Sequence, residues 1–194
     1  MAPDVPFAVA AAVEPLANAI HAFRLAQVYD SISLRVGVIG EGTLGFLIAL
    51  TAADRGVPFI AISDLSIERR ASAMLSGATQ VSAGLEGEFD IVLDAVGSSS
   101  TRRQSLELLC PGGTADWVGL HGADPGFDGL SLICTEKRVL GTFCYQNQDF
   151  RAAFDRVATL SAVGITTFPL EQGADVFQRL VDGDVSSVKS VLIP

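Results

Sequence analysis

The stretch Arg35-Val36-Gly37-Val38-Ile39-Gly40-Glu41-Gly42-Thr43-Leu44-Gly45-Phe46 decides the fold of this chain. An apolar strand runs directly into the pattern G-x-G-x-x-G, and the third glycine opens an apolar helix. A second apolar strand, Phe59–Ile62, follows and leads to Asp64, 24 positions beyond Gly40 (64 minus 40). Strand, glycine turn, helix, strand and acid in this order are typical of a βαβ unit that binds a dinucleotide.

Each glycine of the motif has a distinct role in such a unit. Gly40 allows the tight turn, and Gly42 lets a pyrophosphate approach the backbone because it has no side chain. Gly45 lets the helix pack closely against the strand. The helix N-terminus, at Thr43 and Leu44, offers free N–H groups and the positive end of the helix dipole to the phosphates.

The acid after the second strand predicts which dinucleotide binds. Asp64 would accept hydrogen bonds from the two adenosine ribose hydroxyls and would repel the 2′-phosphate of NADP, so NAD is favoured over NADP. Arg69 is a candidate for stacking on adenine, although both it and Arg70 could simply face solvent. Glu41 lies beside the expected pyrophosphate, which a carboxylate repels, so we expect its side chain to point outward.

Composition narrows the class of protein. The chain has 194 residues, of which 49% are apolar, which excludes a disordered chain. A formal net charge of −9 disfavours binding to nucleic acid or to an anionic membrane. The N-terminus does not resemble a signal peptide, and no apolar run reaches the roughly 18 residues of a membrane span. Cys110, Cys134 and Cys144 have no C-x-x-C spacing, so we expect buried, reduced thiols in a cytoplasmic protein.

Apolar runs and glycine-rich turns alternate along the chain. The runs are continuous, as in parallel strands that are covered on both faces. They predict strands at 34–39, 58–62, 89–94, 113–118, 138–143 and 188–193, and helices at 7–29, 43–55, 66–76, 100–110, 147–162 and 172–182. This order defines an α/β fold with a doubly wound parallel sheet, the Rossmann fold, carrying an N-terminal helix and a short C-terminal helix–strand appendage.

We divide the chain into three parts on this basis. Residues 1–30 form the N-terminal helix that leads into the domain, 31–171 form the NAD-binding Rossmann domain, and 172–194 form the C-terminal helix and strand.

With these motifs in place, the chain resembles the medium-chain dehydrogenases, in particular the zinc-type alcohol and polyol dehydrogenases. The resemblance covers nearly the whole chain and depends on the ordered set of motifs rather than on the glycine motif alone. The matching segments are 13–17, 40–45, 63–66 with 68–70, 89–97, 111–120 and 189–194.

The resemblance implies where the nicotinamide half of the cofactor binds. In open α/β sheets, ligands bind at the carboxyl ends of the strands. The residues expected to contact nicotinamide or its ribose are Val96, Gly97, Val118, Gly119, Leu120 and Phe143. His121 could face the same cleft as a general base, but a solvent-facing loop histidine is the simpler interpretation, and no catalytic residue is assigned.

The chain also departs from that family. Family members begin with a GroES-like catalytic domain that holds the catalytic zinc, and this chain shows no counterpart. Glu14 occupies the position of a glutamate that lies near zinc in the polyol branch, yet one carboxylate cannot supply four ligands. His21 and His121 have no ligand spacing, and we expect His21 to be a packing or surface residue. We therefore expect no zinc on this chain.

Three functional hypotheses follow. The first is the NAD-binding domain of a zinc-type alcohol or polyol dehydrogenase, either excised or naturally truncated, whose catalytic part could be a separate partner. The second is a non-catalytic NAD-binding module or a subunit of a complex, and the third is an enzyme with other chemistry on the same fold. The resemblance also implies a homodimer through residues 138–143, whose apolar edge would otherwise be exposed.

Overall fold

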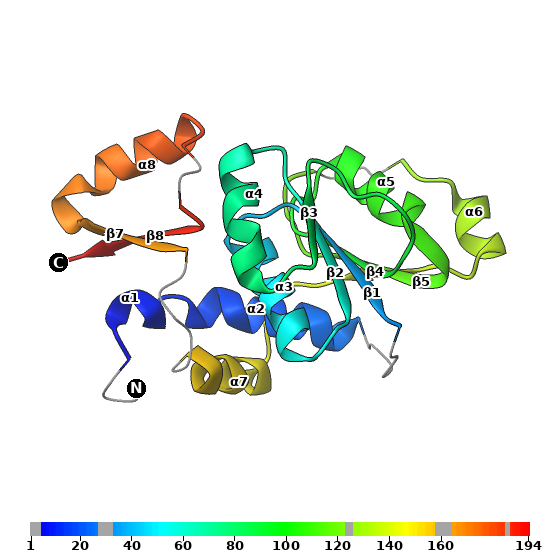
Figure 1. Cartoon of the computed structure of the whole chain (residues 1–194), viewed down its shortest axis with the longest axis horizontal. Helices are drawn as coiled ribbons and strands as arrows, with labels where there is room; N and C mark the ends of the chain where they lie inside the picture. The colour runs from blue at the N-terminus through cyan, green and yellow to red at the C-terminus, as the bar shows by residue number, and fades with distance from the viewer. Residues whose placement is uncertain (1–4, 27–32, 123–125, 158–163, 185–186) are drawn as a thin grey trace.

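The structure is a computed structural model, and it describes residues 5–26, 33–122, 126–157, 164–184 and 187–194. A six-stranded sheet forms its centre, in the order β3-β2-β1-β4-β5-β6, and all neighbouring strands are parallel (Figure 1). The strands are β1 (Arg35–Ile39), β2 (Phe59–Ser63), β3 (Gln80–Ser82), β4 (Phe89–Asp94), β5 (Leu109–Trp117) and β6 (Arg138–Gly141). This order confirms the doubly wound fold predicted from the sequence.

Helices cover both faces of the sheet, which is why its strands are apolar on both sides. One face packs Val36 and Val38 against α2, α3 and α7, and the other packs Val92 and Ala115 against α5. The helices are α1 (Phe7–Ala10), α2 (Val13–Leu25), α3 (Thr43–Asp54), α4 (Ile67–Ala73), α5 (Ser99–Glu107), α6 (Gly129–Cys134), α7 (Asn147–Val157) and α8 (Gly173–Val181), with 3₁₀ turns η1 (Met74–Ser76) and η2 (Leu170–Gln172).

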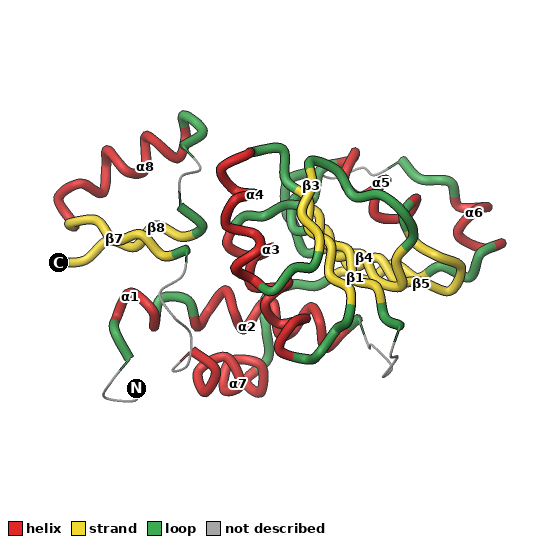
Figure 2. Tube along the Cα trace, in the orientation of Figure 1, coloured by secondary structure: helices red, strands yellow, loops and turns green. Residues whose placement is uncertain are grey.

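A second, two-stranded sheet lies apart from the first one. It pairs β7 (Ile165–Pro169) with β8 (Lys189–Ile193) in parallel, and α8 connects the two strands. Figure 2 shows this pair of strands separated from the main sheet, and α1 contacts both of them. The predicted boundary at residue 171 therefore falls inside a β–α–β unit, with β7 on one side of it and β8 on the other.

Several elements differ from the sequence-based expectations. Strands β3 and β7 and helix α6 were not predicted, because they are short and carry polar or exposed residues that give no periodic apolar signal. The helix expected at 7–29 is interrupted between Ala10 and Val13. The expected helix 100–110 ends at Glu107 and the strand expected from residue 113 begins at Leu109, so Pro111, Gly112 and Gly113 all lie within β5. The ends of the expected helices 7–29 and 147–162 lie outside the described residues.

A polar cluster joins α2 to α7 beneath the sheet. Asp149 is buried, and its Oδ1 accepts a hydrogen bond from Arg24 Nε at 2.8 Å. Its Oδ2 lies 2.7 Å from His21 Nδ1 and also accepts from the backbone N–H of Gln146. His21 is thus a buried packing residue of α2 that pairs with α7.

The Asp149 cluster generates a prediction about stability. Hydrogen bonds, first of all from Arg24, lower the pKa of Asp149 to about 2. The carboxylate therefore stabilises the fold fully above its ordinary pKa of 3.8, and this contribution is lost as the pH falls from there towards 2. Asp149→Asn should lower the free energy of unfolding at pH 7 by about 2 kcal/mol, since it takes a charged hydrogen-bond partner from the half-buried Arg24.

Urea unfolding at pH 7 and pH 3 measures this effect. Asp155→Asn is the matched control, because Asp155 is an exposed acid on the same helix. This substitution should change the free energy of unfolding by no more than about 0.5 kcal/mol. An Asp149→Asn variant as stable as the unmutated chain at pH 7 would contradict the role given to the cluster.

Candidate functional site

The residues predicted to bind a cofactor gather at one edge of the main sheet. Gly40 follows β1, Asp64 follows β2 and Val96 lies just beyond β4, while Val118 and Phe143 follow β5 and β6. Parallel strands in this order bring their carboxyl ends to a common edge, which is where open α/β sheets hold ligands. Fold and motif positions therefore agree on one location.

The glycine turn is built by close backbone approaches. Gly40 has a φ of 90°, and its N–H donates to Ser63 O at 2.8 Å, which joins the turn to the end of β2. A Cβ on Gly45 would lie 1.8 Å from Gly40 O, so only glycine permits α3 to begin this close to the turn. A Cβ on Gly42 would meet no atom of the described residues within 4 Å. The turn thus presents an open space at its middle glycine.

The first turn of α3 faces this open space. Its leading N–H groups have no partner within the helix, as at every helix N-terminus, and they carry the positive end of the dipole. Gly42 is the N-cap residue and has no side chain to occupy those donors. Thr43 and Leu44 are half-buried, and the Thr43 hydroxyl donates to Val188 O. This geometry fits an anionic phosphate group.

Asp64 lies next to the glycine turn and is tied to it. Its Oδ2 accepts from the backbone N–H of Glu41 at 2.8 Å, and its Oδ1 accepts from Ser66 N at 2.8 Å. Arg69 Nη1 lies 3.6 Å from Asp64 Oδ2, while Arg70 Nη1 donates to Asp64 O at 2.7 Å. The carboxylate is therefore held in a fixed orientation at the edge, with Arg69 beside it.

Glu41 corrects one expectation. Its side chain does not point outward but is fully buried, and its Oε1 accepts a hydrogen bond from Ser72 Oγ of α4 at 3.2 Å. The pKa of Glu41 is raised to about 7, first of all by burial and also by the nearby Asp64 carboxylate, while the hydrogen bond from Ser72 and the charge of Arg69 lower it. The side chain packs inward because the turn and α4 enclose it, which the sequence pattern did not reveal.

The turns after β4 and β5 lie in direct backbone contact. A Cβ on Gly97 would lie 2.1 Å from Gly119 O, and a Cβ on Gly119 would lie 2.2 Å from the carbonyl carbon of Val96. The two glycines expected on the nicotinamide side are therefore brought together. Gly40 belongs to the same group, since a Cβ there would lie 2.5 Å from Val96 Cγ2.

Sequence reasoning missed the residues that hold these turns. The buried Asp94 accepts from the N–H groups of Val96 and Gly97 through Oδ1, both at 2.9 Å, and from Thr101 Oγ1 through Oδ2 at 3.0 Å. Arg102 donates to the carbonyl oxygens of Gly119 and Gly122. An acid directly after an apolar strand and before a serine-rich helix start was the available signal for Asp94.

The remaining predicted contacts differ in exposure. Val118 is buried, whereas the side chains of Leu120 and Phe143 are 78% and 73% exposed. Val96 is also exposed at the edge, and so is His121, as expected for a loop histidine. The exposed apolar side chains are those available for contact with a ligand or a partner surface.

The cysteines correct a second expectation. Cys134 and Cys144 are exposed and Cys110 is half-buried, so none of the three is a buried core residue. Cys134 ends the short surface helix α6, and Cys144 follows the edge strand β6 with a φ of 55°. All three are free thiols.

No zinc site is found among the described residues. Nowhere in the described part of the chain do three or more histidine, cysteine, aspartate or glutamate side chains gather as a metal would require. Glu14 is exposed and bonds Asn18 of its own helix. The described residues therefore do not fit a zinc ion.

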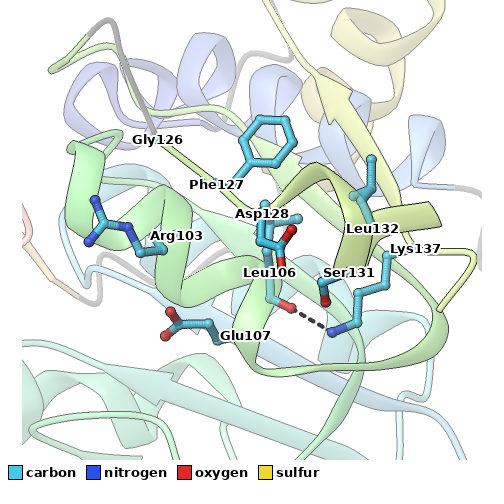
Figure 3. A pocket seen from close by; sticks show the side chains of 9 residues that line it. All are labelled: Arg103, Leu106, Glu107, Gly126, Phe127, Asp128, Ser131, Leu132 and Lys137. Atoms are coloured by element: carbon cyan, nitrogen blue, oxygen red, sulfur yellow. Dashed lines mark hydrogen bonds between the residues drawn. The ribbon is translucent and has the colours of Figure 1, made fainter. Parts of the chain in front are cut away.

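One pocket of the described residues lies away from this edge. It has a volume of about 360 Å³ and lies between α5 and α6, where Lys137 Nζ donates to Leu106 O at 2.9 Å (Figure 3). Leu106 and Glu107 are at the end of α5 opposite to the one that follows β4. None of the predicted cofactor residues lines this pocket.

Comparisons with known proteins agree with the geometry of the edge. The family model described as zinc-binding dehydrogenase matches residues 43–159. D-altritol 5-dehydrogenase of Agrobacterium fabrum is 31% identical over 129 residues, which cover 62% of this chain and 38% of that protein. The structure of acetophenone reductase from Geotrichum candidum in complex with NAD is 27% identical, with a TM-score of 0.86 over 100% of this chain and 57% of that one.

A Sinorhizobium meliloti structure bound to NADP is 26% identical, with a TM-score of 0.86 over 98% of this chain and 61% of that one. The chain thus spans between 38% and 61% of the length of these three proteins.

The edge and its glycine turn define a dinucleotide-binding Rossmann domain. The chain belongs to the zinc-binding dehydrogenase family and corresponds to that family's NAD(P)-binding half. Among the described residues, no helix is both long enough and apolar enough to cross a membrane.

Proposed function

We propose that this chain binds NAD(H) at the carboxyl edge of its sheet and orients it for hydride transfer between an alcohol or polyol carbon and the nicotinamide. The observation that carries the proposal is the open space at Gly42, in front of the N-terminus of α3 and beside the fixed carboxylate of Asp64. The nicotinamide supplies the hydride chemistry when bound, and the residues of this chain supply binding and orientation.

Each part of the edge has a proposed role. The first turn of α3 binds the pyrophosphate, Asp64 accepts the adenosine ribose hydroxyls and Arg69 covers the adenine. The joined turns at Gly97 and Gly119 lie under the nicotinamide, with contacts from Val96, Val118, Leu120 and Phe143. Relatives named as dehydrogenases and reductases of sugars, polyols and ketones support an alcohol–carbonyl substrate pair.

We propose that the cofactor is NAD rather than NADP. A 2′-phosphate would lie against Asp64, whose carboxylate is held by two backbone N–H groups and cannot easily turn away. Arg69 is already engaged with that carboxylate. One similar structure contains NAD and another contains NADP, so the comparisons do not choose between the two cofactors. Our choice of NAD depends on the negative charge of Asp64.

We also propose that two copies pair through β6. This strand forms one edge of the six-stranded sheet, and Phe143 at its end is largely exposed. Two such edges related by a two-fold axis would satisfy each other's backbone groups and cover the apolar side chains. The three free thiols agree with a reducing, cytoplasmic setting for this dimer.

Substituting Gly42 tests the binding of the dinucleotide itself. Gly42→Val should abolish NADH binding with an unchanged melting temperature, because the added side chain fills the pyrophosphate space but meets no protein atom. Gly129→Val is the matched control, since that glycine is equally open but lies on α6 away from the edge. Retained NADH affinity in Gly42→Val, measured by fluorescence titration, would place the cofactor elsewhere.

Asp64→Ala tests the choice of cofactor. The variant should lose about 2 kcal/mol of NADH binding free energy, as expected for hydrogen bonds to a charged group. The difference between its affinities for NADH and NADPH should become smaller. Calorimetric titration of both cofactors against the unmutated chain and the variant measures this change. Asp64→Asn keeps the shape of the side chain and one of the two backbone hydrogen bonds, because its amide oxygen accepts a hydrogen bond and its NH2 group does not. NADPH bound by the unmutated chain as tightly as NADH would refute the assignment.

Sedimentation at micromolar concentration tests the dimer. The unmutated chain should sediment as a dimer and Leu140→Lys as a monomer, because a buried lysine without a partner opposes pairing of two β6 edges. Gln80→Lys places the same charge on the opposite edge strand β3 and should leave the dimer intact. A dimer that survives Leu140→Lys would mean that the contact lies elsewhere.

A further inference from the structure

We propose that Glu41 is a second acid of the dinucleotide site and that the site takes up a proton on Glu41 when it binds the pyrophosphate. This inference rests on the proposed function, because it assumes that a dinucleotide occupies the glycine turn. It makes the affinity of the site for its cofactor dependent on pH.

The position of Glu41 places a carboxyl group inside the phosphate turn. Glu41 lies between Gly40 and Gly42, and its own N–H donates to Asp64 Oδ2 at 2.8 Å. Its side chain is fully buried between the turn and α4, where Ser72 Oγ donates to its Oε1. Its Oε2 is buried and has no hydrogen-bond partner among the residues that the structure describes. An ionised carboxylate with an unpaired oxygen is strongly disfavoured in such a place, whereas a neutral carboxyl group is tolerated.

The charges around Glu41 do not provide the missing partner. Asp64 lies on the side of β2 and is itself an anion. On α4, Arg69 is directed to Asp64, and Arg70 donates to the backbone carbonyl oxygens of Asp64 and the next residue. Glu68 accepts a hydrogen bond from a neighbouring serine and is exposed. Glu41 therefore shares its surroundings with one acid and with cations that are already engaged.

The other side of the turn offers one further charge. The Thr43 hydroxyl donates to Val188 O, and Lys189 follows at the start of β8. Lys189 is half-buried, and the residue before it contacts the first residue of α3.

These surroundings determine the pH at which the Glu41 carboxyl group becomes protonated. Burial raises the pKa of the Glu41 carboxyl group to about 7, so it is about half ionised near neutral pH in the free protein. A bound pyrophosphate brings about two further negative charges to the adjacent helix N-terminus and raises this pKa again. Binding and protonation are then linked, and each favours the other.

The size of the effect follows from this linkage. A further rise of one unit in the pKa of Glu41 corresponds to a tenfold difference in affinity between its neutral and ionised forms. NADH affinity should therefore fall about eightfold from pH 6 to pH 9. Binding near pH 7.5 should take up about half a proton, since the free and bound carboxyl groups then titrate on either side of that pH.

Calorimetric titration of NADH into the unmutated chain measures both quantities. Titrations at pH 6, 7.5 and 9 give the affinity, and buffers with different ionisation enthalpies give the number of protons taken up. ADP-ribose is the second probe, because it carries the pyrophosphate without the nicotinamide and should show the same dependence on pH. Glu41→Gln keeps the size of the side chain and should bind both ligands without proton uptake and with an affinity independent of pH.

Two further variants separate Glu41 from other titrating groups. Ser72→Ala removes the hydroxyl that donates to Glu41, so it should shift the fall in affinity to higher pH. Asp116→Asn removes another buried acid, on β5 and separated from β1 by β4, whose pKa burial also raises to about 7. Asp116→Asn should retain the proton uptake of the unmutated chain.

Thermal unfolding without ligand tests the buried acid independently. The folded pKa of Glu41 lies above its ordinary value of 4.5, so the folded state keeps a proton that the unfolded state releases between pH 4.5 and about 7. The unmutated chain should therefore lose melting temperature relative to Glu41→Gln as the pH rises through this range. The difference should become constant above pH 8.

The outcomes distinguish the inference from the function on which it rests. Binding of NADH with equal affinity at pH 6 and pH 9, or the same proton uptake in Glu41→Gln, overturns the inference and leaves the proposed function in place. Absence of NADH binding in both proteins at every pH overturns the proposed function and the inference together. A melting temperature of Glu41→Gln that follows the unmutated chain at every pH shows that Glu41 is not a buried acid, which also overturns the inference.

Discussion

The structure depends on one close contact, between the first turn of α3 and the carbonyl oxygen of Gly40. Gly45 has no side chain, and a Cβ there would lie 1.8 Å from that oxygen. Because the helix can approach so closely, its N-terminus ends at the carboxyl edge of β1, beside Asp64 at the end of β2. The same contact therefore sets the packing of α3 on the sheet and the position of the phosphate-binding donors.

A second group of contacts fixes the other half of the edge. Asp94 accepts hydrogen bonds from the turn after β4, and Gly97 and Gly119 bring that turn against the one after β5. Arg102 holds the second turn through two carbonyl oxygens. The turns after β4 and β5 thus depend on polar side chains that hold the backbone, while the glycine turn after β1 depends on the absence of side chains.

The charge at the adenosine end is unusual for a site that binds an anion. Glu41 and Asp64 are both acids, and the cations nearest to them are engaged with Asp64 or with backbone carbonyl oxygens. The helix N-terminus is therefore the principal source of attraction for the phosphate that we propose to bind at this edge. The Glu41 carboxyl group becomes neutral near pH 7, which reduces the negative charge that would repel a phosphate. This is consistent with the position of Glu41 inside the turn.

The sequence by itself determined the doubly wound sheet, the glycine turn and the place of Asp64, because strand order and glycine spacing are encoded locally and in chain order. Continuous apolar runs identified β1, β2 and β4, and the turn residues followed from the motif. Only the tertiary structure decided that Glu41 points inward and that His21 pairs with Asp149, since these contacts join residues from different elements. It also decided that Asp94 and Arg102 hold the turns after β4 and β5, and that β7 pairs with β8. Short strands and buried polar groups leave no periodic signal, because their partners are distant along the chain.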